Sequence, residues 1–193
     1  TMARKKALLD FSKKHNLKIG TIADLINYRI FNEQTVKRLE GKSVKTEHGK
    51  FNLILYKDLI FEETHIVLQK GRISKNTPTL VRVQQSNLYH DLLNIDEFGT
   101  RWSVSDAMKK INKAGNGIIL LIDGDNNKEN EFKEIRASKK KRKTIPNNDP
   151  RRIGIGSQIL RDLGVKKIKL MGSEVRYPSL SGFDLEVTEY IKK

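Results

Sequence analysis

The stretch whose residues could most readily take part in chemistry is DPRRIGIGSQILRDLG, residues 149–164. Gly154 and Gly156 stand near the start of an expected helix, where bare backbone could approach a phosphate group. A dinucleotide-binding fingerprint also needs a third glycine and an acidic residue about twenty positions later, so the pair alone is weak evidence. Small residues at this place also let a helix pack close to a strand, and this packing role is the interpretation that we adopt.

Two other polar segments could bind ions. The sequence Asp123-Gly-Asp-Asn-Asn127 follows an apolar run, but it lacks the later ligands and terminal glutamate of a calcium-binding loop, so we expect a polar turn. Five consecutive cations occupy residues 139–143, without an aromatic residue on which a base could stack. We interpret this run as a solvated loop; the alternatives are a loop that gathers anions and an arm that binds nucleic acid.

Composition limits the other classes of chemistry. The 193 residues carry a formal charge of +15, which attracts anions without choosing among them. The chain has no cysteine, which excludes disulfides, thiolate nucleophiles and cysteine-based zinc sites, and its four histidines show no ligand spacing. No apolar run approaches the roughly 20 residues of a membrane span, and no signal-peptide pattern is present, so we expect a cytoplasmic protein without a membrane partner.

Periodicity predicts the elements that hold these residues. A short helical N-terminal segment is expected over residues 3–14, with a second helix starting at Thr21 as its N-cap. Alternation then predicts strands near residues 51–55, 65–68 and 80–83, and because no helix separates them we expect antiparallel pairing.

Helices and strands alternate in the rest of the chain. A helix is expected from Ser103 or Ser105 to Gly115, followed by a fully buried strand over residues 117–122. Helices over residues 129–138 and from Asp149 to Gly164 come next, and the remaining expected elements are a strand at 167–171, a helical turn at 178–182 and a strand at 185–189. The fold class is α+β, one main domain with a mixed, partly antiparallel sheet and flanking helices.

Two segments resemble enzymes of riboflavin biosynthesis. TMAR at residues 1–4 and KKHNLKIGTIADLINYR at 13–29 resemble the tail of 3,4-dihydroxy-2-butanone 4-phosphate synthase. The resemblance implies that the synthase active site, with its Mg²⁺ cofactor, lies upstream of these residues. We therefore expect residues 1–40 to be synthase tail and linker.

Residues 45–193 resemble GTP cyclohydrolase II. The similarity is carried by RRIGIGSQILRDLGVKKIKL at 151–170, LSGFDLEVTEYI at 180–191, and GIILLIDGDNNKENEFKEIRAS at 117–138. The resemblance implies a zinc site of three cysteines, but Gln84, Gln85, Ser86 and Asn87 stand where the family has histidine, serine, glutamate and the first cysteine. We expect no metal in this domain, and no cofactor of any kind in this chain.

Other positions that the resemblance identifies are also replaced. Residues 123–127 stand where the family carries Arg-Gln-Glu-Gly-Arg for binding GTP, and Ser138 stands where it has its catalytic tyrosine. In the last loop, Gly172 replaces a nucleotide-binding threonine and Tyr177 a lysine. The coordinated loss of unrelated parts of one mechanism argues against cyclohydrolase activity.

Some functional positions do match the family pattern. The resemblance makes Asp149 the acid/base residue and Arg151 the group proposed to attack the α-phosphate, and Arg82 and Arg176 are candidate nucleotide-binding cations. Structural roles are the alternative: Asp149 as a helix N-cap and Arg151 as a first-turn cation. Guanidinium stays protonated, so Arg151 outside a tuned site is a poor nucleophile, and we regard the pair as vestigial.

The hypothesis from sequence is a degenerate GTP cyclohydrolase II-like domain, not itself an enzyme, that stabilises, dimerises or assembles an upstream synthase. The expected partners are that synthase domain and a second copy in a homodimer. The alternative is residual binding of GTP, or release of pyrophosphate, through Asp149 and Arg151. Nucleic-acid binding through the lysine-rich run is the third and least favoured class.

Overall fold

The computed structural model describes residues 5–21, 24–25, 28–29, 32–85, 91, 102–123, 150–174 and 178–193. Two compact units make up the chain, residues 1–33 and 34–193. In the first unit, helix α1 spans Lys5–Lys14. Thr21 caps the next helical turn as expected: its Oγ1 accepts from the Asp24 amide at 3.0 Å, and the Asp24 carboxylate accepts from the Thr21 amide at 3.2 Å.

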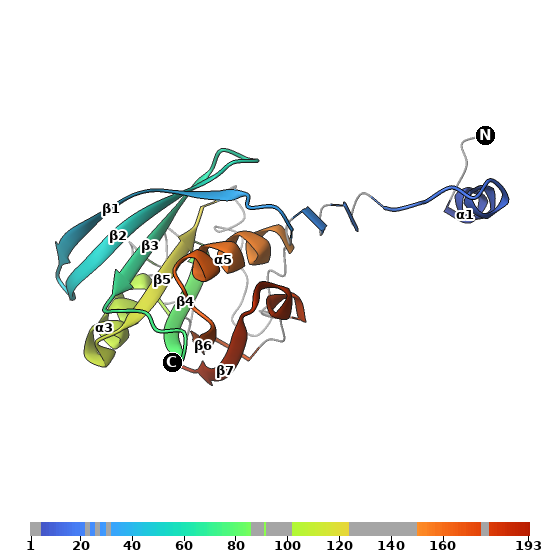
Figure 1. Cartoon of the computed structure of the whole chain (residues 1–193). Helices are drawn as coiled ribbons and strands as arrows, with labels where there is room; N and C mark the ends of the chain where they lie inside the picture. Colours follow the sequence, from blue (N-terminus) through green and yellow to red (C-terminus); the bar gives the residue numbers. More distant parts are fainter. Residues whose placement is uncertain are drawn as a thin grey trace, which may run out of the picture. The chain divides into compact units, whose positions relative to one another are not determined.

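The second unit is built on one seven-stranded mixed sheet in the order β1-β2-β3-β5-β4-β6-β7 (Figure 1). The strands are β1 Val36–Thr46, β2 Gly49–Asp58, β3 Thr64–Lys70, β4 Thr79–Gln85, β5 Gly117–Ile122, β6 Lys167–Met171 and β7 Glu186–Ile191. Helices α3, Val104–Ala114, and α5, Pro150–Asp162, connect strands, and the 3₁₀ helix η4 spans Pro178–Phe183.

The expected antiparallel pairing is confirmed for β2 and β3 but is wrong for β4, and β1, which was not predicted as a strand, pairs antiparallel with β2. Strand β5 pairs with β3 in the place expected for β4, and β4 pairs in parallel with β5 and β6. The reason is the crossover through α3, because a strand that follows a helical crossover returns parallel to the one before it. As a consequence, β4 and β5 end at the same edge of the sheet.

The two helices cover opposite faces of the sheet. Ile119 packs in a cluster with Trp102 and the α3 residues Ala107, Met108 and Ile111. A Cβ added to Gly156 of α5 would lie 3.2 Å from Ile122 and 3.6 Å from Leu120, so α5 packs on the other face, where these neighbours of Ile119 point. The close approach confirms the packing role expected for Gly156.

Local signals in the sequence correspond to the observed boundaries. Ser103 caps α3 by accepting from the Asp106 amide, and Gly115 ends it in the left-handed conformation, as expected. Gly164, at φ +82°, likewise follows α5. The sheet unit starts at residue 34 and its strand β1 at Val36, so residues 36–40 of the expected tail and linker are part of the sheet. Among the described residues, no helix is long and apolar enough to cross a membrane.

Candidate functional site

Strand β4 and the first turn of α5 hold the two expected site residues that the structure describes, Arg82 and Arg151. Arg82 lies on β4, and its guanidinium donates to the carbonyls of Met171 at 2.8 Å and Trp102 at 3.2 Å. Its Nε donates to the side chain of Gln84 at 2.8 Å. Arg82 therefore ties the end of β6 and the start of the α3 segment to β4.

The two glutamines at the end of β4 take part in further cross-links. Gln84 donates to both carboxylate oxygens of Asp91 at 3.1 and 3.0 Å, and Asp91 also accepts from the amide of Val104 at the start of α3. Gln85 accepts from Nη1 of Arg152 in α5 at 2.5 Å. The two side chains that stand shortly before the position of the family's first cysteine thus hold neighbouring segments together.

Arg151 points from the first turn of α5 toward the turn between β2 and β3. Its Nη2 donates to the carboxylate of Glu63 and lies 3.9 Å from the Asp58 carboxylate. The guanidinium carbon stands 3.4 Å from the ring centroid of Phe61, a cation–π geometry. The Arg151 side chain is 29% exposed. It is therefore a partly buried counterion of this turn, whereas the structural alternative drawn from the sequence expected only a surface cation in the first turn of the helix.

Asp58, Glu63 and His65 form a group whose ligand atoms lie within 4.8 Å of one another, which raises the possibility of a metal site. Asp58 Oδ1 already accepts from the amides of Ile60 and Phe61, a local turn role. Nδ1 of the fully buried His65 accepts from the amide of Asp123 at 3.1 Å.

The His65 hydrogen bond decides against a metal ligand. Nδ1 uses its lone pair to accept from the Asp123 amide, so the neutral ring carries its proton on Nε2. A histidine that binds a metal gives the lone pair of one nitrogen to the metal and donates a hydrogen bond from the N–H of the other. In His65 the only lone pair is already used. Burial, opposed by the nearby carboxylates, lowers the pKa of His65 and keeps the ring neutral. Arg151 supplies the positive charge beside the carboxylates, so these residues do not fit a divalent cation.

Several expected site residues lie outside the described part of the chain. They are the acid/base candidate, the positions aligned with the family's nucleotide-binding and tyrosine residues, and the lysine-rich run: Asp149, residues 124–127, Ser138, residues 139–143, Arg176 and Tyr177. Their roles stay predictions. Sequence reasoning did not identify the turn residues Asp58, Glu63 and His65; the histidine inside an apolar strand was the available signal.

Comparisons with known proteins agree with this architecture. The family model for GTP cyclohydrolase II matches residues 37–192. A Pseudomonas aeruginosa protein named 3,4-dihydroxy-2-butanone 4-phosphate synthase is 41% identical over 201 residues, covering 99% of this chain and 53% of that protein. The riboflavin biosynthesis protein RibBA of Aquifex aeolicus is 37% identical, covering 99% and 50%.

A solved structure gives the same result. The crystal structure of RibBX, described as a two-domain 3,4-dihydroxy-2-butanone 4-phosphate synthase from A. baumannii, matches with a TM-score of 0.60 and 38% identity, covering 100% of this chain and 51% of that one. The chain belongs to the GTP cyclohydrolase II family. It spans about half the length of the relatives that it matches.

Proposed function

We propose that residues 34–193 form a GTP cyclohydrolase II-like domain that no longer opens GTP and that acts in riboflavin biosynthesis by stabilising or assembling an upstream 3,4-dihydroxy-2-butanone 4-phosphate synthase. The similar sequences and the similar solved structure both support a role in riboflavin biosynthesis, since these proteins are named for the synthase or for riboflavin biosynthesis. The upstream synthase domain and a second copy of the chain are the proposed partners. Mg²⁺ would serve the synthase and not this domain.

The observation that carries the proposal is the internal pairing of the site. Arg82 and Arg151, for which the resemblance implies nucleotide chemistry, and Gln84, which stands where the family has a histidine, each form hydrogen bonds within the protein. A site built to bind a triphosphate needs its donors available and aimed at the ligand. The missing thiolates remove the implied Lewis acid as well, because the chain has no cysteine.

A deletion experiment tests the structural role. The full-length protein that carries these residues would be compared with a version lacking residues 34–193, measuring synthase rate, thermal stability and oligomeric state. A second variant, Ile119→Asp, places a carboxylate at a fully buried position and unfolds the same unit while keeping the chain length. We expect reduced stability or altered assembly in both. Synthase properties equal to the parent protein in both versions would reject the structural role.

A turnover experiment tests the loss of chemistry. The chain would be incubated with GTP and Mg²⁺, with and without Zn²⁺, while formate, pyrophosphate and the ring-opened product are followed together. We expect none of the three products. Pyrophosphate without formate, abolished by Arg151→Ala, would favour the alternative of a residual phosphate-releasing half-site, and formate would reject the proposal.

A further inference from the structure

A polar pocket lies on the α5 face of the sheet, at the opposite end of α5 from Arg151. It is formed where β1, β2 and β3 extend past the end of the helix, and its volume is about 490 Å³. Arg151 and Asp162 are separated by eleven residues of α5, about 16 Å at 1.5 Å per residue. The pocket is therefore separate from the candidate site described above.

The strand register explains why this part of the sheet is polar. Ser43, Asn52 and Gln69 are direct partners across β1, β2 and β3, so their side chains share one face. Closer to the helix, Tyr56 and Val67 on that face are fully buried. The face thus changes from apolar to polar at the end of α5, and the polar part lines the pocket.

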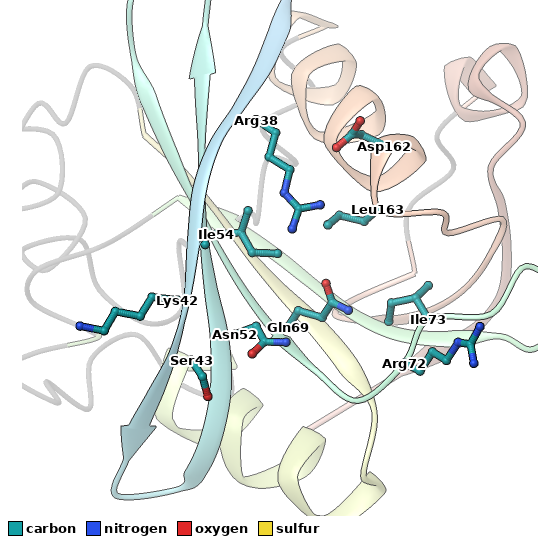
Figure 2. A pocket seen from close by; sticks show the side chains of 11 residues that line it. Arg38, Lys42, Ser43, Asn52, Ile54, Gln69, Arg72, Ile73, Asp162 and Leu163 are labelled. Carbon is teal, nitrogen blue, oxygen red and sulfur yellow. The ribbon is translucent and has the colours of Figure 1, made fainter.

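A β-bulge directs a cation into the pocket. The pairing of β1 with β2 shifts between Arg38 and Gly41, which adds a residue to β1. Figure 2 shows the Arg38 guanidinium directed into the space between the sheet and Leu163, with the Gln69 amide pointing toward it from the floor. Gly41 keeps this space open, because an added Cβ would lie 3.4 Å from Ile54 and 3.9 Å from Arg38 Nη2.

The charge of the lining favours an anion. Arg38, Lys42 and Arg72 line the pocket, with Arg72 at one rim and Lys42 extending away at the other (Figure 2). Among the described residues, none of the three forms an ion pair. The one acidic group in the described lining is Asp162, whose carboxylate accepts from the Tyr56 hydroxyl at 2.6 Å.

We propose that this pocket binds a small phosphate-bearing molecule that also carries hydroxyl groups. Arg38 and Arg72 would hold the phosphate, since guanidinium matches phosphate geometry. Asn52, Gln69 and Ser43 offer donors and acceptors for hydroxyls, and the lining that the structure describes holds no aromatic side chain on which a base could stack. The proposal does not depend on the function assigned to the other end of α5.

Calorimetry on the full 193-residue chain tests the pocket, with ribose 5-phosphate and inorganic pyrophosphate as probes. Arg38→Gln and Arg72→Gln should each weaken binding about tenfold, the expected effect of losing a hydrogen bond to a charged group. Lys37→Gln is the matched control: Lys37 is exposed and adjacent to Arg38, but points to the opposite face of β1 and does not line the pocket. Its binding should equal that of the parent chain.

A steric variant separates pocket binding from general attraction to a basic protein. Gly41→Val leaves every charge in place and fills the space below Arg38, and it should abolish binding while the circular dichroism spectrum is unchanged. No heat with either probe at millimolar concentration, equal weakening by Lys37→Gln, or binding that depends on Arg151 instead of Arg38 would each overturn the proposal.

Discussion

Replacing Arg151 with methionine separates a structural from a catalytic role for this residue. The change keeps an unbranched apolar stem and removes the guanidinium group with its charge. In the structure, Arg151 donates to Glu63 and lies over the Phe61 ring, with its side chain 29% exposed. A hydrogen bond between charged groups contributes about 1.5–3 kcal/mol and a partly exposed cation–π contact about 0.5–1 kcal/mol, and partial solvation lowers the sum.

We therefore expect Arg151→Met to lower the free energy of unfolding by about 1–3 kcal/mol. Urea unfolding of the chain measures it, with fluorescence of Trp102, the only tryptophan, which is buried beside α3. Glu63→Gln and the double variant complete a cycle, whose coupling energy should be about 1 kcal/mol or more if the two side chains stabilise each other. Arg152→Met removes the neighbouring cation together with its hydrogen bond to Gln85, and it should show no coupling to Glu63→Gln. Additive effects in the cycle, with unchanged stability in Arg151→Met, would refute the structural role.

Three other predictions concern stability. Burial is the main cause that lowers the pKa of His65 in the folded state, so on acidification the unfolded chain binds the proton first. The free energy of unfolding should therefore fall as the pH drops below about 6.5, by at most about 1.4 kcal/mol per pH unit. His65→Asn should reduce this slope in urea titrations, and an equal slope would contradict a buried neutral ring. Tyr56→Phe removes the hydroxyl that donates to Asp162 at 2.6 Å and should cost about 1–2 kcal/mol in the same assay, whereas no loss would mean that water replaces this bond at no cost. Gly117 has φ +154°, and a Cβ there would lie 2.8 Å from the Leu80 carbonyl and 2.9 Å from Ile111 of α3, so Gly117→Ala should cost about 2–4 kcal/mol. Gly115 has φ +80° and open space around it, so Gly115→Ala should cost about 1 kcal/mol. Equal melting temperatures in the two variants would contradict the packing of α3 on the sheet.

Local signals in the sequence predicted those parts of the fold that depend on neighbours along the chain. Ser103 and Gly115 bound α3 because capping involves residues a few positions apart, and the apolar run Gly117–Ile122 marked a strand buried on both faces. The pairing of β4 could not be predicted in this way. It depends on which strand lies beside β3, and that partner is supplied by β5 after the α3 crossover.

Strand β1 shows a second limit of sequence patterns. Most of its eleven residues are exposed, and the bulge between Arg38 and Gly41 interrupts alternation, so the segment resembled a linker. The site has the same limit on a longer scale. Arg151 was identified from a family pattern, but its partner Glu63 is 88 residues away, and nothing in either local sequence connects them.

The pairing of polar groups at the end of β4 gives a physical reason why the fold would persist in a domain that has lost the chemistry of the family, as we propose. An active site holds charged groups ready for a substrate, at a cost in stability when no substrate is bound. Here Gln84 bonds Asp91, Gln85 bonds Arg152 and Arg151 bonds Glu63, and the last two of these connections join segments far apart in the sequence. Substitutions that remove substrate contacts can in this way add contacts within the protein. A domain kept for stability or assembly gains from each such exchange, whereas an enzyme would lose activity by it.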